Sequence, residues 1–177
     1  MTSTPRSQAV VIPEPSTGPR FYEQTWDLSY RHALGNTTSR FLAGLAAGRV
    51  YGRACSQCRR VLVPARSFCD RCHRATGDWL QVSTSGVIEM FTVVYEPFRG
   101  LPEPPYALAY VMLDGADTAL PGYVRGLDLT DVEAVTKTLA IGTRVRVAFA
   151  ENSVGSVADY WFELETDSAD PSVGANG

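Results

Sequence analysis

Four cysteines in two identical pairs constrain this chain more than any other feature. They form the motifs Cys55-x-x-Cys58 and Cys69-x-x-Cys72, and no other cysteine occurs among the 177 residues. Structural Zn²⁺ takes four soft ligands in a tetrahedron, and each C-x-x-C turn supplies two of them. Ten residues separate the pairs, which is about the length of a short hairpin that returns the second pair to the first. We therefore predict a zinc site made of all four thiolates.

Two disulfides or four unrelated thiols are the alternatives to a metal site. Disulfides require an oxidising compartment, and the apolar run at residues 9–12 is too short for a signal peptide. A redox C-x-x-C motif normally occurs once, at the start of a helix. Because four thiolates fill the tetrahedron, no position stays open for water or substrate. We therefore expect the zinc to be structural, and we do not expect a zinc hydrolase.

Composition and charge narrow the class of protein further. A hydrophobic content of 45% can support a core, and no run approaches the roughly 18 apolar residues of a membrane span. We expect a cytoplasmic protein without a membrane segment. Residues 49–74 carry seven arginines against Asp70 alone, whereas residues 79–177 carry fourteen acidic and five basic residues. The arginines either offset the charge of about −2 on a four-thiolate zinc site or bind phosphate or an acidic partner.

The first third of the chain is expected to be an arm followed by helices. Residues 1–19 are rich in Pro, Ser and Thr and predict a flexible arm, and the tail at 167–177 predicts disorder. The helical segment, residues 20–48, has two parts. Apolar residues recur at helical spacing over 20–34, which ends before a glycine. A second helix follows, with Asn36-Thr37-Thr38 offering the N-cap and Gly48 at the C′ position.

The remainder is expected to be β structure. Residues 49–79 predict a zinc ribbon, which is too short to bury enough apolar area unaided, so the metal must stabilise it. Residues 80–166 predict five strands with a helix between the third and fourth, which is the order of an OB-fold barrel. Thr130 and Glu133 have the spacing of a capping box at that helix, and Gly86 offers a bend in the first strand. The strands are expected at 82–95, 106–113, 120–124, 142–150 and 157–164, the fourth with Arg144 and Arg146 on its outer face.

Several local sequences together resemble the DUF35 family over about residues 20–165. They are the two C-x-x-C motifs around Pro64-Ala65-Arg66, then Trp79, Ser85-Gly86, residues 91–94, Pro104-Pro105-Tyr106 and residues 141–149. The resemblance implies N-terminal helices, a rubredoxin-like zinc ribbon and a C-terminal OB-fold. The segments 26–32 and 38–42 look like a narrower branch, whose members partner thiolase-like aldolases of the lipid-transfer-protein type in steroid side-chain degradation. The fold class we predict is mainly β, with two N-terminal helices, a four-cysteine ribbon and a five-stranded barrel.

The chain departs from the family pattern in the two cysteine turns. Many members have a glycine after the second cysteine of each pair, and here Arg59 and His73 take those places. Neither residue need prevent zinc binding, although both add polar groups beside the site.

The resemblance implies an accessory subunit rather than an enzyme acting alone. We expect no catalytic residues in this chain and a thiolase-like aldolase subunit as its partner, in a heterotetramer with two copies of each. The complex would cleave a β-hydroxyacyl-CoA, with a steroid side chain as the expected acyl group, and the aromatic helices and barrel surface would form the interface. An accessory subunit of a condensing thiolase is an alternative. Candidates for contacts with CoA phosphates are Arg59, Arg60 and Arg66.

A search for an independent active site finds no catalytic constellation. The only histidines are His32 and His73. We interpret His32 as an interface or surface residue and His73 as a solvated neighbour of the metal. Glu89, Asp114 and Asp117 are the candidates for acid–base pairs, but places in turns and on solvated strand positions account for them equally well.

Nucleic-acid binding is the alternative from another functional class. OB-folds bind single strands through basic grooves and stacking aromatic residues. Here the predicted barrel is net acidic and would repel phosphates, so we expect no nucleic-acid partner.

Overall fold

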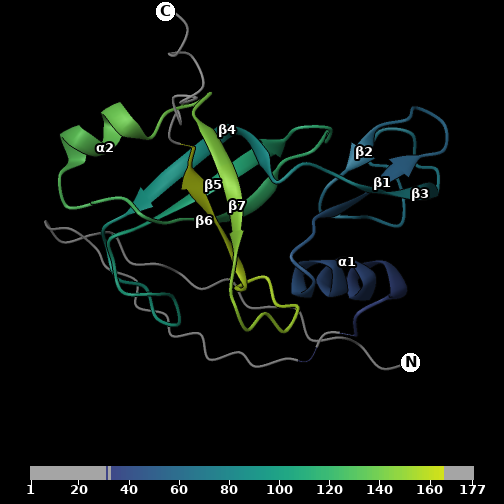
Figure 1. The fold of residues 1–177 in the computed structure, drawn as a ribbon, viewed down its shortest axis with the longest axis horizontal. Coiled ribbons are helices and arrows are strands. Elements are labelled where there is room, and N and C mark those ends of the chain that lie inside the picture. Colours follow the sequence, from purple (N-terminus) through teal and green to yellow (C-terminus); the bar gives the residue numbers. More distant parts are fainter. Residues whose placement is uncertain (1–30, 32, 166–177) are drawn as a thin grey trace, which may run out of the picture. The chain divides into compact units, whose positions relative to one another are not determined.

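The computed structural model describes Arg31 and residues 33–165. In this part the chain is mainly β, as predicted, with two helices, a three-stranded sheet and a closed five-stranded barrel (Figure 1). The predicted arm and tail lie outside the described residues. So does most of the helix expected at 20–34, of which only Arg31, Ala33 and Leu34 are described, and these three are not helical.

The second expected N-terminal helix is α1, Asn36–Ala46. Its N-cap is Gly35, which makes no side-chain capping bond, so the cap expected at residues 36–38 is wrong. The Thr37 hydroxyl instead accepts a hydrogen bond from Arg53, at 3.3 Å. Gly48 follows the helix with φ of 66°, the left-handed conformation predicted for the C′ position. Phe41 and Leu45 are buried and turn the apolar side of α1 toward the core.

The ribbon contains three short antiparallel strands in the order β2-β1-β3. The strands are β1 (Tyr51–Cys55), β2 (Val61–Leu62) and β3 (Thr76–Gln81). The first C-x-x-C turn connects β1 to β2, and the second lies between β2 and β3. The sheet therefore carries both cysteine pairs at the same end, where β1 reaches Cys55.

The five strands of the barrel pair in the order β4-β5-β6-β8-β7, and β4 closes onto β7. All neighbouring pairs are antiparallel except β6 and β8, which pair in parallel at Val124 and Phe162. Along the chain, helix α2 lies between the third barrel strand, β6, and the fourth, β7, so the OB-fold prediction is confirmed. The elements are β4 (Ser85–Val94), β5 (Tyr106–Leu113), β6 (Leu120–Val124), α2 (Val132–Thr138), β7 (Arg144–Phe149) and β8 (Tyr160–Leu164).

The capping box predicted for the barrel helix is wrong by one residue. Asp131 is the N-cap of α2, and its carboxylate accepts bonds from the backbone N–H groups of Glu133 and Ala134, at 3.0 and 3.1 Å. Thr130 instead donates its hydroxyl to Asp128 at 2.6 Å. Because that bond occupies the Thr130 side chain in the preceding turn, the next residue caps the helix.

The irregularity in the long strand β4 lies at Glu89 rather than at Gly86. The register to β5 shifts between Ile88 and Met90, which is a bulge that bends the strand. Gly86 has a different role, because β4 pairs there with both β5 and β7. A Cβ at Gly86 would lie 2.7 Å from the Leu113 Cα, so only glycine allows the backbones to approach this closely.

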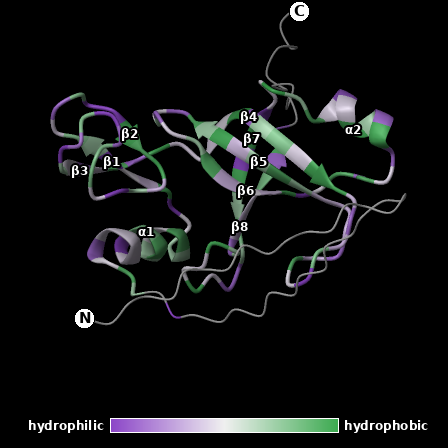
Figure 2. Cartoon of the chain, turned by 180° about the vertical axis from the view of Figure 1, so that it is seen from behind, coloured by the Kyte–Doolittle hydropathy of each residue, from purple (hydrophilic) through white to green (hydrophobic). Residues whose placement is uncertain are grey.

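One hydrophobic cluster connects α1, the base of the ribbon and the barrel. It includes Phe41 and Leu45 of α1, Val50 and Val63 at the ribbon base, and Phe162 in the barrel, all 4% exposed or less. Hydrophobic residues follow the barrel strands, whereas the outer loops of the ribbon are largely hydrophilic (Figure 2). A second, small cluster of buried residues at the cysteine end contains Cys55, Leu62 and Cys69.

Hydrogen bonds also join strand β2 of the ribbon to the loop between β5 and β6. The Val61 N–H donates to the Asp117 carboxylate at 2.8 Å, and the Asp117 N–H donates back to the Val61 carbonyl at 2.8 Å. The Thr118 hydroxyl accepts from the Val63 N–H at 2.7 Å and donates to the Val63 carbonyl at 2.8 Å. The polar edge of β2 is thus paired with the barrel.

Candidate metal centre

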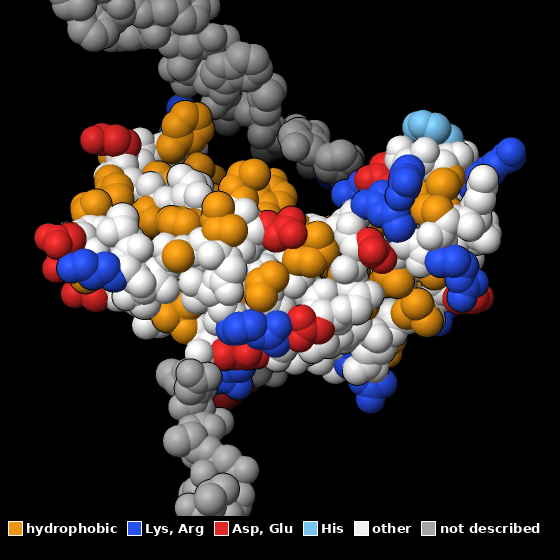
Figure 3. Space-filling view, turned by 90° about the horizontal axis from the view of Figure 1, so that it is seen from above, with side chains coloured by type: hydrophobic (Ala, Val, Ile, Leu, Met, Phe, Trp, Pro, Cys, Tyr) orange, Lys and Arg blue, Asp and Glu red, His pale blue; other side chains and the backbone are white. Residues whose placement is uncertain are grey.

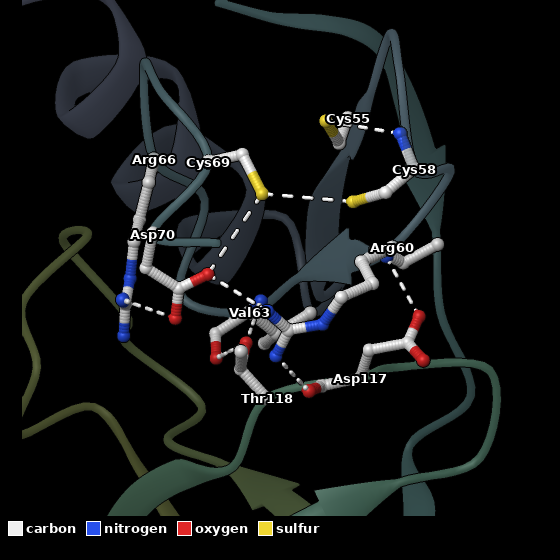
Figure 4. Close-up of polar contacts among 10 residues, drawn as sticks. Cys55, Cys58, Arg60, Val63, Arg66, Cys69, Asp70, Asp117 and Thr118 are labelled. Atoms are coloured by element: carbon white, nitrogen blue, oxygen red, sulfur yellow. Dashed lines mark hydrogen bonds and ion pairs between the residues drawn. The ribbon is translucent and has the colours of Figure 1, made fainter. Parts of the chain in front are cut away.

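The four cysteine sulfurs lie together at the end of the ribbon. All four Sγ atoms are within 4.8 Å of one another, and those of Cys58 and Cys69 are 3.7 Å apart (Figure 4). A tetrahedron with Zn–S bonds of about 2.3 Å has sulfurs roughly 3.8 Å apart. A disulfide requires about 2.05 Å, and all four cysteines are free thiols. The donor set and spacing therefore fit Zn²⁺, and the disulfide alternative is wrong.

The two cysteine turns repeat one hydrogen-bond pattern, which explains how they present their sulfurs alike. In each, the N–H of the first cysteine donates to the carbonyl five residues later, and the residue four later donates back to the cysteine carbonyl. The bonds are Cys55 to Arg60 at 2.8 Å, Arg59 to Cys55 at 3.1 Å, Cys69 to Arg74 at 2.8 Å and His73 to Cys69 at 2.9 Å.

Arg59 and His73 occupy the positions where the turns require a left-handed backbone. Their φ angles are 64° and 54°, and in the described residues no other non-glycine residue has a positive φ. Glycine reaches this conformation without the strain that a Cβ introduces. The glycine preference that the DUF35 resemblance implies at these two places thus has a physical cause, and this chain accepts some strain at both.

Backbone donors around the first cysteine prepare it to bind a cation. The N–H groups of Cys58 and Gln57 both lie 3.4 Å from the Cys55 sulfur and lower the pKa of that thiol to about 6. The pKa of Cys72 is raised to about 12 by its hydrogen bond with Cys58, by burial and by the neighbouring thiols. Four thiolates cannot share this volume without a positive charge, so metal binding must release protons.

The site is closed in a way that suits a structural metal. Cys55 and Cys69 are fully buried and Cys58 and Cys72 half-buried. Four protein ligands leave no tetrahedral position for water or substrate. Among the described residues, this is the one group of three or more His, Cys, Asp or Glu side chains close enough to hold a metal. The four cysteines would therefore hold Zn²⁺ as a structural ion.

Two of the three arginines expected at CoA phosphates have partners within the chain. Arg60 makes an ion pair with Asp70 at 2.8 Å and donates to the Asp117 carbonyl, and Arg66 lies 3.6 Å from the same carboxylate (Figure 4). Burial alone would raise the pKa of Asp70, but the charges of Arg60 and Arg66 lower it below its usual range. Arg59 is exposed and makes no ion pair within the described part of the chain.

A stack of two arginines on the ring of one tryptophan was not predicted from the sequence. The guanidinium of Arg40 in α1 lies 4.7 Å from the centre of the Trp79 ring, and that of Arg53 lies 5.4 Å from it. Arg53 also donates to the carbonyls of Thr76 and Gly77. The stack ties α1 to the ribbon sheet. No local pattern predicts it, because Arg40 and Trp79 are far apart in sequence.

The acidic residues considered as acid–base candidates are not brought together. Asp114 is held by Arg144, at 2.9 and 2.8 Å, and Asp117 accepts the Val61 N–H. Glu89 is exposed at the bulge of β4. His73 is exposed beside the metal centre, and His32 lies outside the described residues.

Comparison with protein families matches both parts of the chain. Residues 42–76 match the rubredoxin-like zinc ribbon domain of ChsH2, and residues 79–150 match the C-terminal OB-fold domain of ChsH2. Together the two matches cover more than half of the chain. The chain belongs to the ChsH2 (DUF35) family. The zinc ribbon of ChsH2 thus coincides with the four clustered cysteines, and its OB-fold with most of the barrel.

Solved structures share the fold of this ChsH2-family chain. A chain of the "Ltp2-ChsH2(DUF35) aldolase" is 19% identical with a TM-score of 0.58, and the match covers 76% of this chain and 98% of that one. A DUF35 protein of unknown function from Sulfolobus solfataricus is also 19% identical, with a TM-score of 0.54 and coverage of 74% and 87%. No curated protein matches the chain. None of the helices described is long and apolar enough to cross a membrane.

Proposed function

We propose that this protein is a non-catalytic accessory subunit of a thiolase-superfamily aldolase. The observation that carries the proposal is its membership of the ChsH2 family through both domains, together with the likeness to a chain of the Ltp2-ChsH2(DUF35) aldolase over nearly the whole of that chain. The name of that aldolase joins two proteins, Ltp2 and ChsH2. By analogy, this chain has a thiolase-like partner, in a heterotetramer with two copies of each subunit.

The reaction of the complex is retro-aldol cleavage of a β-hydroxyacyl-CoA. The bond between the α and β carbons breaks, the β-hydroxyl loses its proton as a ketone forms, and the α carbon gains a proton as a shorter acyl-CoA is released. A steroid side chain is the acyl group that the family resemblance indicates. The partner supplies the acid and base, because the acidic candidates of this chain are dispersed and Asp114 is occupied by an arginine. Arg59 remains the candidate among the three arginines for contact with CoA.

The role of the zinc in this proposal is to hold the ribbon. Cys55, Cys58, Cys69 and Cys72 would bind the ion, and its charge allows four thiolates to lie together. Cysteines that bind metal instead of forming disulfides are typical of reducing compartments, so a cytoplasmic location is part of this proposal.

The OB-fold barrel argues against a nucleic-acid function. OB-folds bind oligonucleotides on the face of their second and third strands, here β5 and β6. Single strands need basic groups there to follow the phosphates. In this barrel the outward residues of β5 are Leu108, Tyr110 and Met112, and those of β6 are Pro121 and Tyr123. An uncharged face of this kind suits a protein or an apolar ligand better than a polyanion.

Co-expression tests the proposal most directly. The full chain is produced with the thiolase-superfamily protein encoded nearest to it, and the mixture is analysed by size exclusion and by a cleavage assay with β-hydroxyacyl-CoA thioesters. We expect a stable complex and activity that requires both proteins. A partner that is soluble and fully active alone would refute the accessory role. Running the assay in the condensing direction separates an aldolase from a condensing thiolase, the alternative partner enzyme.

Nucleic-acid binding needs its own measurement. Titration of the chain with fluorescent single-stranded DNA in low salt should show no saturable binding at micromolar concentrations. Micromolar binding would instead favour the nucleic-acid function.

A further inference from the structure

The outward side of three barrel strands is unusually apolar for a surface in contact with water. In β5 the residues at odd positions from Ala107 to Leu113 are buried, so those at even positions from Leu108 to Met112 point outward. The register places Met90 of β4 opposite Tyr110, and Pro121 of β6 opposite Tyr110 on the other side. The apolar face, as we name this surface, consists of Val87, Met90, Thr92 and Val94 in β4, Leu108, Tyr110 and Met112 in β5, and Pro121 and Tyr123 in β6.

The neighbouring strands β7 and β8 of the same barrel show what a solvated face looks like, and β7 pairs with β4 so that Arg144 lies opposite Val87. On β7, Arg144 pairs with Asp114 and Glu165, and Arg146 pairs with Glu163 of β8 at 2.8 Å. None of the nine residues of the apolar face is charged. The single charged residue in strands β4, β5 and β6 is Glu89, at the bulge. Hydrophobic side chains gather over the barrel, whereas basic side chains gather over the ribbon (Figure 3). Exposed apolar surface of this extent indicates an interaction site.

The apolar face continues into a pocket at the start of β5. The pocket has a volume of about 310 Å³, and its walls include Tyr106, Tyr123, Leu129 and two prolines of the β4–β5 loop, Pro102 and Pro105. The two tyrosine rings meet edge to face, with centroids 5.8 Å apart. Interfaces concentrate their binding energy where an apolar side chain fills a desolvated pocket, and this pocket has largely apolar walls for such a side chain.

The β4–β5 loop adds exposed apolar side chains beside the pocket. The Leu101 N–H donates to the Phe98 carbonyl at 3.1 Å, and Gly100 has φ of 83°, so a tight turn presents both side chains. Exposed fractions are 71% for Phe98, 50% for Leu101, 42% for Tyr95, 61% for Met90 and 51% for Tyr110. Side chains of this size then offer roughly 100–150 Å² each, on the order of 600 Å² together. A stable interface buries about 800 Å² on each partner, so this surface is large enough to form most of one.

Charges at the margin decide between a second copy of this chain and a different protein. Glu89, Glu96 and Glu103 flank the apolar face and its loop, against Arg99, whereas Arg144 opposite Val87 is already paired with Asp114 and Glu165. Arg125, at the pocket, is stacked on Trp161 with 4.4 Å to the ring centre. Two copies meeting through this face would bring acidic margins together, which costs binding energy. A partner with an apolar patch and basic residues around it fits better.

We propose that the apolar face is the surface on which the thiolase-like subunit docks, with an apolar side chain of that subunit in the pocket beside Tyr123. This inference rests on the proposed function for the identity of the partner. It adds which side of the barrel the partner covers, and it leaves the charged face of β7 and β8 in water.

Charge introduced on the apolar face tests the proposal. The variants are Met90→Glu, Met90→Glu with Tyr110→Glu, and Tyr123→Ala, in the full chain. The control is Val132→Glu, because Val132 is also apolar and 56% exposed but lies at the start of α2. Affinity for the thiolase-superfamily protein encoded nearest to this chain is measured by calorimetry. Zinc content and thermal melting of each variant verify the fold, and Met90→Glu, the mildest change, remains informative if the double variant does not fold.

We expect at least 30-fold weaker binding for the double variant, about 10-fold for either single variant and less than 2-fold for the control. If the unmodified chain binds its partner and the folded face variants bind equally well, the docking surface is refuted while the accessory function stands. If the unmodified chain does not bind at all, both proposals fail. A dimer of this chain that dissociates only in the face variants would show that a second copy occupies the face, and would also overturn the proposal.

Discussion

The cysteine end of the ribbon and the core of the barrel are stabilised by different means. At the cysteine end, the small buried cluster contains two thiols and one aliphatic side chain, Leu62. In the barrel, large side chains such as Phe162, Ile88 and Leu120 are less than 2% exposed. Each buried aliphatic or aromatic side chain stabilises by about 1.5–3 kcal/mol, so apolar burial is the main stabilising contribution in the barrel. The cysteine end has only Leu62 of this kind, so we expect it to depend on the metal.

The base of the ribbon belongs with the barrel rather than with the cysteine end. Val50, Val63 and Val82 are part of the main hydrophobic cluster, and Thr118 of the β5–β6 loop bonds to both backbone groups of Val63. The sequence-based expectation that the metal alone stabilises the ribbon therefore applies to its outer half. The inner half is held by packing and hydrogen bonds that connect distant segments.

Removing one zinc ligand should give the largest and most localised effect. Cys55→Ser leaves three thiolates, and structural zinc contributes an apparent 10–16 kcal/mol in zinc-finger peptides. We expect zinc to fall from one equivalent to well below one, and amide protection in the cysteine turns to disappear while barrel amides keep theirs. Metal analysis and hydrogen exchange measure both. Gln57→Ser is the matched control, since it keeps the backbone N–H beside the sulfur; unchanged zinc in Cys55→Ser would contradict a four-cysteine site.

Truncating the centre of the barrel should reverse that pattern. Phe162 is fully buried, and Phe→Ala in a core costs about 3–5 kcal/mol. We expect urea unfolding of Phe162→Ala to show this loss, while the fraction that stays folded keeps its full zinc. The control is Phe98→Ala, which removes a phenylalanine side chain that is 71% exposed. It should change stability by less than about 0.5 kcal/mol. Loss of zinc in the folded fraction would show that the two regions are not separable.

Breaking the polar link between the regions should have an intermediate effect. Thr118→Val removes both hydrogen bonds to Val63 and leaves the N–H of this buried residue without that partner, at a cost of about 1–3 kcal/mol. The expected signature is faster exchange of the Val63 amide than of barrel amides. Thr136→Val is the control, because its hydroxyl bonds only within the exposed helix α2. Equal exchange in both variants would place the connection in the apolar cluster alone.

The metal centre and the barrel order were predictable because both depend on local patterns. Cysteine spacing determined the ligand set, and alternation with a helix after the third strand determined the barrel. Errors arose where nearby polar residues compete. Thr130 and Asp131 both suit an N-cap, and Asp128 decides between them by binding Thr130. At α1 the N-cap is Gly35, whose backbone is extended and which has no side chain to cap the helix.

Contacts between distant segments could not be predicted from one sequence. The two arginines on Trp79, the pairing of Arg60 with Asp70 and the junction at Val63 each depend on the finished fold. The sequence alone revealed the apolar face only in part, because alternating or continuous apolar runs do not show which residues of different strands are neighbours. The pairing register was needed to show that Met90, Tyr110 and Pro121 lie side by side on the outside.

The ion pair between Asp114 and Arg144 should give the smallest effect, and it tests whether the charged face of the barrel is an ordinary solvated one. The hydrogen bond from Arg144 lowers the pKa of Asp114 below its usual 3.8. A carboxyl group whose pKa is lower in the folded than in the unfolded protein stabilises the fold. This stabilisation is fully present at pH values above the unfolded-state pKa, and it is lost as the pH falls through the folded-state pKa. The side chains are 44% and 51% exposed, so we expect Asp114→Asn to cost only about 0.2–1 kcal/mol at pH 7. Urea unfolding from pH 7 to pH 3 should show the difference from the unmodified chain shrinking below about pH 4, and 0.5 M salt should reduce it at pH 7. A larger loss that persists at pH 3 would mean that Asp114 stabilises the barrel through its backbone position rather than its charge.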